Sequence, residues 1–301
     1  MRPIPSLDLL VRVGCRLTYT APGEVPVLLK LKPRMDPWQL VQQERLRLGD
    51  RLPCEEFEDA HGNSCYRLVL QPGLNEVSHD ALVLVPSVSD NFNQGYDAPV
   101  GLAALPVGLL RYTLPSRYCD SDKLLEFAWK EFGQVPPGHA QVRAVSNWIH
   151  ANIEYRFGSG RPDLSASEVI ARRHGVCRDF AHVGIALCRA LNLPARYVTG
   201  HLPDIGYVDP GSPMDFHAYF EVYLAGRWFA YDPRYNVPRI GRVKLACGLD
   251  AVDCAFATIY APVALSYFEV WAYQVAAGTV SVGDPIDLSK RLDGSIDVRY
   301  G

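Results

Sequence analysis

Three residues in the second half of the chain have the types and surroundings of a nucleophile with its proton acceptor. Cys177 stands at the start of a predicted helix in the stretch RRHGVCRDFAHVGIAL, residues 172–187. A thiol attacks as its anion, and the unpaired N–H groups of a helix N-terminus favour an anion. Gly175 would let a substrate carbonyl approach the sulfur, and the Cys177 amide would face the developing oxyanion. Asp179, in the first turn, is interpreted mainly as a helix cap.

The helix that follows Cys177 is predicted to be buried. Residues 180–191 leave little polar face, and a helix that is apolar around most of its circumference lies inside a protein. Cys188 is about three turns further on, roughly 16 Å along the axis, so it cannot bridge to Cys177 within this helix. We expect Cys188 to be a core residue.

His217 and Asp232 are the candidate partners of the thiol, because a nucleophilic Cys usually pairs with a His that an acid orients. They lie in FHAYFEVYLAGRWFAYDP, residues 216–233, which predicts two strands. A two-residue turn at 225–226 would place Tyr219 opposite Asp232, and Asp232 diagonally across from His217 on the same face. A three-residue loop would move Asp232 to the other face.

The elements around these residues predict an α+β protein. Residues 1–112 read as short strands ended by Pro or Gly, typical of a sandwich or small barrel, with one helical segment beginning at Asp36. From 113 to 277, helices precede an antiparallel sheet, which differs from βαβ alternation. We predict a β-rich N-terminal domain (1–112), a catalytic core (113–277) and a C-terminal strand tail (278–301). The helical patterns of the core lie in residues 120–133, 139–158, 165–175 and 177–191.

Composition argues against several classes of function. The 301 residues carry 30 basic and 33 acidic side chains, a net charge of −3, which gives no electrostatic footprint for nucleic acid. No apolar run approaches the ~20 residues of a membrane span, and the first residues lack the apolar centre of a signal peptide. The eight cysteines contain no CxxC pair. We therefore expect mostly buried free thiols, a cytoplasmic location, and neither nucleic-acid nor membrane partners.

Two stretches resemble the bacterial transglutaminase-like family, a branch of the papain-like cysteine enzymes. They are GVCRDFAHVGIALCRALNLPARYVTGH and DFHAYFEVYLAGRWFAYDPR, and KLACGLDAVDCAFATIYAP is similar to the segment that follows them in these proteins. The front half resembles the domain often attached to them. One departure is Ala218, where many members have a Trp directly after the His.

The resemblance implies a Cys-bearing helix packed on an antiparallel sheet that carries the His and the Asp. It implies Cys177 as nucleophile, His217 as base and acid, and Asp232 as the orienting residue. The expected reaction is acyl transfer on an amide of a protein or peptide substrate through a thioester, without a cofactor. Both hydrolysis and transfer to an amine are open, with hydrolysis favoured. Tyr155 and Trp148 are considered as oxyanion donors and interpreted as core residues, and no oligomeric state is predicted.

Two other interpretations stay open. The chain could be a catalytically idle peptide-binding or scaffolding module on the same fold. A metal site is disfavoured because no CxxC or tight ligand spacing occurs. Its candidate ligands would be Cys177, His174, His182, His201 and His217.

Overall fold

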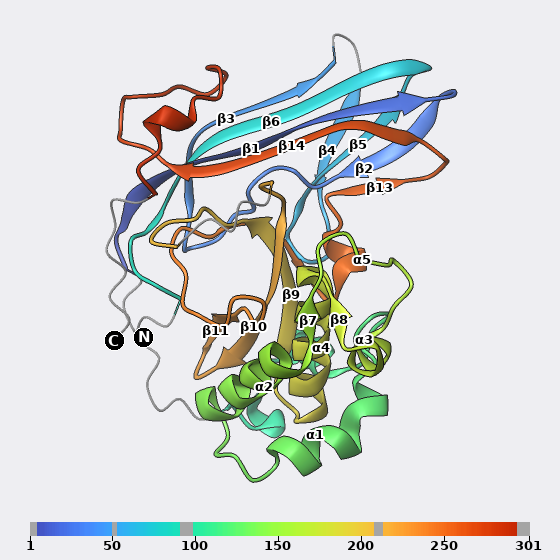
Figure 1. The fold of residues 1–301 in the computed structure, drawn as a ribbon, viewed down its shortest axis with the longest axis vertical. Helices are drawn as coiled ribbons and strands as arrows, with labels where there is room; N and C mark the ends of the chain where they lie inside the picture. The colour runs from blue at the N-terminus through green and yellow to red at the C-terminus, as the bar shows by residue number, and fades with distance from the viewer. Residues whose placement is uncertain (1–4, 50–52, 91–98, 208–212, 294–301) are drawn as a thin grey trace.

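The computed structural model describes residues 5–49, 53–90, 99–207 and 213–293. Within these ranges the chain forms three four-stranded antiparallel sheets and a group of helices (Figure 1). Two of the sheets lie at the top of Figure 1, and the helices gather at the bottom around the third sheet. The predicted α+β class with a β-rich N-terminal region is confirmed.

The N-terminal residues build two sheets, with strand orders β14-β1-β6-β3 and β13-β2-β5-β4. Val11, Val13 and Leu17 lie on one face of β1 and are fully buried, and Arg12 on the opposite face is buried as well, so the middle of β1 is covered on both sides. The strands are β1 (Leu7–Ala21), β2 (Val25–Leu29), β3 (Leu40–Leu48), β4 (Cys54–Glu58), β5 (Ser64–Leu70) and β6 (Gly73–Pro86). Three 3-10 helices, η1 (Leu102–Ala104), η2 (Val107–Thr113) and η3 (Ser121–Leu124), lead into the helical part.

The expected helix at Asp36 is wrong, because this segment forms a turn followed by β3. The Asp36 carboxylate accepts the Trp38 N–H at 2.9 Å, which closes a tight turn instead of capping a helix. β3 then pairs with β6, and its register shifts between Val41 and Gln43. Such a bulge breaks the alternation of apolar and polar residues that would reveal a strand in the sequence.

The last strands of the chain return to the N-terminal sheets. β13 (Ala257–Ile259) pairs with β2, and β14 (Ala264–Gln274) pairs with β1 along most of its length. In Figure 1 they run as orange and red strands beside blue ones. The predicted core range of 113–277 therefore includes two strands that complete the N-terminal sheets. The division into domains stays a prediction.

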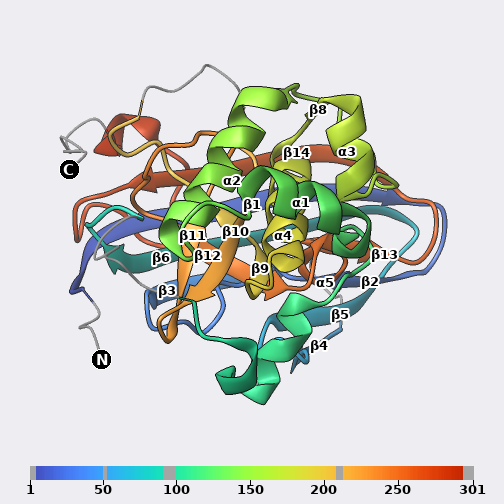
Figure 2. The same cartoon turned by 90° about the horizontal axis from the view of Figure 1, so that it is seen from below.

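The helical part surrounds one central helix, α4 (Cys177–Ala190), which contacts each of α1, α2 and α3 (Figure 2). A capping box opens α3, in which the Ser165 N–H donates to the Glu168 carboxylate at 2.7 Å. No helix in the described part of the chain combines the length and apolar character needed to cross a bilayer. The remaining helices are α1 (Leu125–Phe132), α2 (His139–Asn152), α3 (Ala166–Arg172), α5 (Ala251–Cys254) and η4 (Leu288–Lys290).

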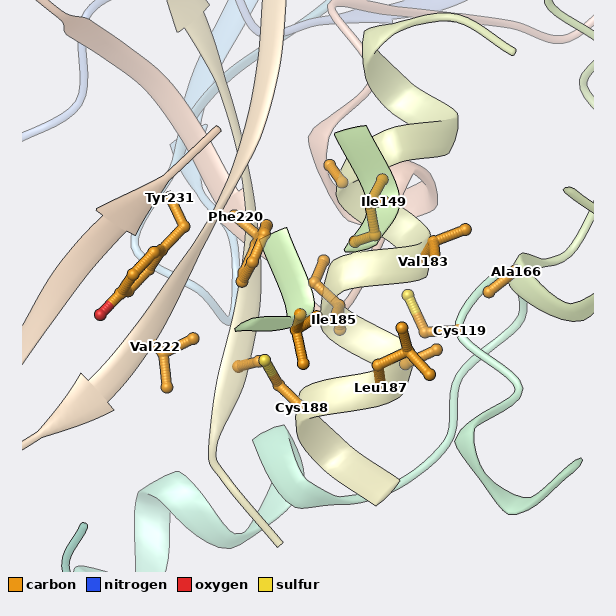
Figure 3. Close-up of a cluster of buried hydrophobic side chains, with 14 of the residues drawn as sticks. Cys119, Ile149, Ala166, Val183, Ile185, Leu187, Cys188, Phe220, Val222 and Tyr231 are labelled. Carbon is orange, nitrogen blue, oxygen red and sulfur yellow. The ribbon is translucent and has the colours of Figure 1, made fainter. Parts of the chain in front are cut away.

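α4 is buried on all sides, as its sequence predicts. Ile149 of α2 packs with one side of the helix, and Phe220 and Val222 of the third sheet pack with the other (Figure 3). Cys188 lies in this core with no exposed surface. The third sheet has the order β11-β10-β9-β12. Its strands are β9 (Ala195–His201), β10 (His217–Leu224), β11 (Arg227–Tyr231) and β12 (Val243–Gly248).

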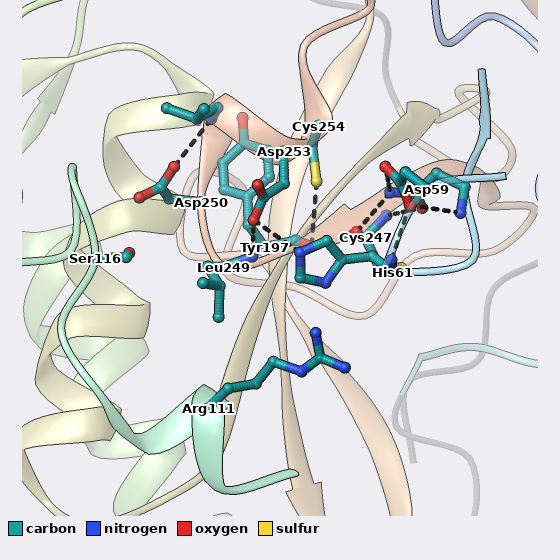
Figure 4. A network of polar contacts seen from close by, with 12 residues as sticks. Asp59, His61, Arg111, Ser116, Tyr197, Cys247, Leu249, Asp250, Asp253 and Cys254 are labelled. Atoms are coloured by element: carbon teal, nitrogen blue, oxygen red, sulfur yellow. Dashed lines mark hydrogen bonds and ion pairs between the residues drawn. The ribbon is translucent and has the colours of Figure 1, made fainter. Parts of the chain in front are cut away.

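Two side-chain amides join the N-terminal strands to the free edge of β12. Asn63 donates to the Cys247 carbonyl and accepts the Cys247 N–H, both at 2.8 Å. Gln39 makes the same pair of bonds with Lys244, at 2.9 and 2.8 Å. Beside Asn63, Nε2 of His61 lies 3.2 Å from the Asp253 carboxylate (Figure 4). Each amide thus makes the backbone hydrogen bonds that a neighbouring strand would make at a paired edge.

Candidate active site

Cys177 is the first residue of α4, and its sulfur lies against β10. The preceding residue, Val176, has extended backbone angles and forms the N-cap. The backbone N–H of Ala218, which directly follows His217, donates toward the Cys177 sulfur. Cys177 is partly exposed, whereas six of the other seven cysteines are buried and Cys54 is exposed. All eight are free thiols. The helix start therefore places the Cys177 sulfur beside the strand that carries His217.

A short parallel pair holds the chain in front of the helix. β7 (Glu154–Tyr155) pairs with β8 (His174–Gly175), and the Arg156 N–H donates to the Gly175 carbonyl at 2.9 Å. The space above Gly175 does not receive a substrate, because a Cβ atom there would meet the Asp179 carboxylate at 2.6 Å. That carboxylate accepts the Val176 N–H at 2.9 Å. Asp179 is thus a helix cap. Its carboxylate occupies the space that a side chain at position 175 would need, so only glycine fits there.

The predicted register of the hairpin is confirmed. Leu224 pairs with Arg227, and Phe220 with Tyr231. Positions 225 and 226 both have positive φ, +46° and +90°, as a two-residue turn with the twist of a hairpin requires. Asp232 follows the last residue of β11, and its Oδ2 lies 2.6 Å from His217 Nε2.

Burial and charge set the protonation states of these three groups. Burial lowers the pKa of His217 and outweighs the Asp232 carboxylate, which acts in the opposite direction. Burial would raise the pKa of Asp232, but the hydrogen bond from His217 and the charge of Arg242 hold it well below its usual range. Asp232 is therefore ionised and accepts the proton on Nε2, which leaves Nδ1 of a neutral His217 free to take a proton.

The thiol does not ionise by itself near neutral pH. Burial raises the pKa of Cys177 to about 11, although Arg234 and the Ala218 N–H oppose this. The helix N-terminus alone is therefore insufficient to make a thiolate. Any chemistry at neutral pH has to start from a thiol that hands its proton to a base.

A pocket of about 50 Å³ opens beside His217. It is lined by aromatic and apolar side chains and by three charged residues, Asp204, Asp215 and Arg234. The Arg234 guanidinium lies 3.9 Å from the centre of the Tyr155 ring and 4.6 Å from that of Tyr235. Its charge acts on both Cys177 and His217. The pocket therefore brings a cation held by aromatic rings close to the sulfur.

Tyr155 and Trp148 have different places in the structure. Tyr155 lines the pocket, and its ring carries the Arg234 guanidinium. Trp148 packs edge-on against Phe127 and Phe132, as expected of a core residue.

The histidines considered as metal ligands have separate surroundings. His174 lies with Nδ1 3.0 Å from the Arg172 carbonyl. His182 is stacked on Tyr118 and accepts the Ala251 N–H at 3.2 Å. His201 packs on Phe216. Across the described ranges, no three His, Cys, Asp or Glu side chains are grouped so that they could hold a metal ion.

The sequence gives no indication of Arg242, although this residue touches the candidate Asp. Its Nη2 donates to Asp232 Oδ2 at 3.0 Å, and its Nε donates to both oxygens of Asp90. Arg242 precedes β12 and Asp90 lies beyond β6, so no local spacing connects these residues with Asp232. Contacts of this kind between charged side chains cannot be inferred from a hydrophobic pattern.

Comparison with known proteins adds to this geometry. The model of the transglutaminase-like superfamily matches residues 130–233, a range that contains Cys177, His217 and Asp232. A crystal structure of a protein from Cytophaga hutchinsonii, described as a "putative cysteine protease", is 33% identical to this chain with a TM-score of 0.81. The two structures correspond over 90% of this chain and 92% of that one. The chain belongs to the transglutaminase-like superfamily.

Curated relatives of this transglutaminase-like protein share a smaller part of it. An uncharacterised protein from Mycobacterium leprae is 28% identical over 144 residues, which are 47% of this chain and 51% of the relative. One from Mycobacterium bovis is 32% identical over 153 residues, 48% of this chain and 49% of that protein. The chain thus spans about half the length of the curated relatives it matches.

Proposed function

We propose that this transglutaminase-like protein is an enzyme that cleaves amide bonds of a protein or peptide through a thioester on Cys177. The observation that carries the proposal is the placement of Cys177, a partly exposed residue, at a helix start with its sulfur against the N–H of Ala218. The residue before Ala218 is His217, whose Nε2 lies 2.6 Å from Asp232 Oδ2. A nucleophile, a base and an orienting carboxylate are what covalent acyl transfer needs. The family relationship and the candidate cysteine protease of similar fold support it.

In this reaction Nδ1 of His217 takes the Cys177 proton as the sulfur attacks the substrate carbonyl carbon. The Cys177 N–H, in the first turn of α4, donates to the oxyanion that forms. The imidazolium then gives its proton to the leaving amine, and a thioester remains. Water, deprotonated by His217, attacks the thioester and restores the thiol with release of the acid. A lysine-type amine in place of water would give transfer, and we favour hydrolysis.

The charges at the pocket make a general-base mechanism more suitable than a permanent thiolate–imidazolium pair. The pKa of Cys177 is raised to about 11 by burial, and the pKa of His217 is lowered by burial. Both groups are therefore neutral at pH 7, and the proton moves only when a substrate carbonyl stabilises the developing charge. We expect activity to fall as the pH drops below the His217 pKa, and to persist far above pH 8.

A second candidate function is an idle peptide-binding module, which is also compatible with a thiol whose pKa is raised by burial. Such a module would need a pocket that binds a peptide, but it would not cleave the peptide. The alkylation profile of the thiol cannot separate the two, because a general-base enzyme also keeps its thiol protonated. Turnover of a covalent intermediate separates them.

The proposal is tested with amide substrates and a Cys54→Ala background, because Cys54 is the exposed cysteine and would also react with alkylating agents. In this background, a panel of glutaminyl peptides and isopeptides is assayed for released amine and acid. We expect turnover that is lost in Cys177→Ala and reduced by about 100-fold or more in His217→Gln. Equal turnover with and without Cys177 would contradict the proposal, and binding without turnover would favour the idle module.

A further inference from the structure

Arg242 shares an oxygen atom of Asp232 with His217. Its Nη2 lies 3.0 Å from Asp232 Oδ2, the atom that His217 Nε2 approaches at 2.6 Å. The side chain of Arg242 is 6% exposed, and its guanidinium lies 4.3 Å from the centre of the Tyr219 ring. The ring and the carboxylate together hold this cation in one place. A fixed, buried charge therefore lies next to the His217–Asp232 pair.

Asp90 binds the same edge of the guanidinium, because Arg242 Nη2 lies 2.9 Å from Asp90 Oδ2 and 3.0 Å from Asp232 Oδ2. The Nε of Arg242 lies 3.0 and 2.9 Å from the two oxygens of Asp90. The backbone of Asp90 is itself tied down, because its N–H donates to the Arg239 carbonyl at 3.0 Å and its carboxylate accepts the Arg239 N–H at 3.1 Å. Asp90 comes four residues after β6, a strand of the N-terminal sheets. The N-terminal part of the chain thus reaches the carboxylate of the candidate triad through one arginine.

This arrangement changes the electrostatics at His217. Burial lowers the pKa of His217 most, and Arg242 lowers it further, whereas Asp232 raises it. Burial alone would lower the pKa of Arg242, but Asp90 and Asp232 raise it, so the guanidinium stays charged. Arg234 also lowers the pKa of His217. The titratable and charged groups around His217 are Tyr155, Asp204, Asp215 and Arg234 in its pocket, Tyr219 and Tyr235 through their rings, and Asp232 and Arg242 through their charges. Cys177 is close along the strand, because its sulfur accepts from the N–H of Ala218, the residue after His217.

We propose that Arg242 and Asp90 are positioning residues that hold the Asp232 carboxylate toward His217, so that the N-terminal part of the chain completes the catalytic pair. This inference rests on the proposed function of Cys177 and His217. Asp232 Oδ2 accepts hydrogen bonds from both Arg242 and His217. The bond from Arg242 fixes the carboxylate, and the carboxylate in turn orients the His217 imidazole. Asp90 offsets part of the Arg242 charge and keeps the guanidinium from turning away from Asp232.

The inference predicts opposite effects of two substitutions on one titration. Removing the cation in Arg242→Gln raises the pKa of His217, by about one unit, because a like charge near the imidazolium is lost. Removing the anion in Asp90→Asn lowers it, by about half a unit, because the Arg242 charge is then less compensated. The pKa is read from the imidazole resonances of histidine-labelled protein across the pH range, and His217→Gln identifies the His217 signal. This measurement needs no substrate.

Arg242→Lys separates position from charge. A lysine keeps the cation but cannot bridge Asp90 and Asp232 as the guanidinium fork does. We expect its His217 pKa to stay closer to the native value than in Arg242→Gln, while kcat falls about tenfold and KM is little changed. Because the lysine and the Asp90→Asn variants keep most of the packing, they decide the matter if Arg242→Gln does not fold.

The matched control is Arg12→Gln, which removes another buried arginine. Arg12 pairs with Asp80 at 2.7 Å within the N-terminal sheets. Its loss should lower stability but leave the His217 pKa unchanged. Unchanged His217 titrations in folded Asp90→Asn and Arg242→Gln, together with native kcat in Arg242→Lys, would overturn the inference. If Arg242→Gln does not fold, an unchanged titration of Asp90→Asn with native kcat in Arg242→Lys does the same. If the His217 pKa shifts in opposite directions in Arg242→Gln and Asp90→Asn but no variant or native protein turns over substrate, the electrostatic link from Asp90 through Arg242 to His217 stands. The proposed enzyme activity would then be refuted.

Discussion

Gly184 of α4 lies directly against Phe220 of β10. A Cβ atom at position 184 would stand 2.3 Å from a carbon of the Phe220 ring, closer than such atoms can approach. The contact sets the distance between the helix that begins at Cys177 and the strand that begins at His217. Both candidate catalytic residues thus depend on one small residue in the core.

Gly184→Ala is expected to destabilise the protein by about 1–3 kcal/mol, because an added methyl group forces a well-packed core apart. It should also lower turnover, since any outward shift of α4 moves the sulfur away from the imidazole. Urea unfolding and the amide-cleavage assay measure the two effects. Gly101→Ala is the matched control, because nothing lies within 4 Å of a Cβ atom there. Native stability of Gly184→Ala would show that the helix and strand can separate freely.

Arg234→Met is expected to slow alkylation of Cys177. Burial is the main cause that raises the pKa of Cys177, and the Arg234 charge opposes it. Without that charge the thiol pKa rises further, and each unit of pKa reduces the thiolate fraction about tenfold. Iodoacetamide labelling in the Cys54→Ala background measures the rate at pH 9. Arg67→Met, which removes a surface arginine paired with Glu55, serves as the control and should leave the rate unchanged.

Glu221 predicts a pH dependence of stability. Burial would raise the pKa of Glu221, but Arg196 and Lys244 hold it at about 2, below the usual 4.5. A folded-state pKa below that of the unfolded chain means stability that is present above pH 4.5 and is lost as the pH falls toward 2. Glu221 should therefore contribute about 2 kcal/mol less to the free energy of unfolding at pH 3 than at pH 6.

The check on Glu221 is a comparison of urea unfolding for the native protein and Glu221→Gln at pH 6 and pH 3. At pH 6 the variant is less stable, because the buried charges of Arg196 and Lys244 lose the carboxylate that they share, and Lys244 retains its pair with Asp36. The difference should shrink at pH 3. Glu126→Gln, at an exposed position of α1, controls for general effects of acid. A difference that does not vary with pH would contradict the assignment of an ionised, doubly paired Glu221.

The features that follow from local patterns were predictable from the sequence. The apolar circumference of α4 predicts its burial, and the two-residue turn fixes the register that brings Asp232 onto the face of His217. β3 was misread because its bulge interrupts the alternation. The partners of β13 and β14 depend on pairings with strands more than 200 residues earlier, for which the local sequence carries no signal.

The electrostatics of the site were the least predictable part. A helix N-terminus indicates a stabilised thiolate, yet burial dominates and raises the pKa of Cys177 to about 11. Burial depends on the whole fold, so a short motif cannot reveal it. The contact between Arg242 and Asp232 likewise requires the third dimension.

The most direct test of the account is to trap the covalent intermediate. Cys54→Ala protein is mixed with the amide substrate panel, quenched in acid within seconds and analysed by peptide mass spectrometry. The account predicts an acyl adduct on the peptide that carries Cys177, released by hydroxylamine and absent from Cys177→Ala. Substrate cleavage without any adduct on Cys177, or adducts only on other cysteines, would contradict it.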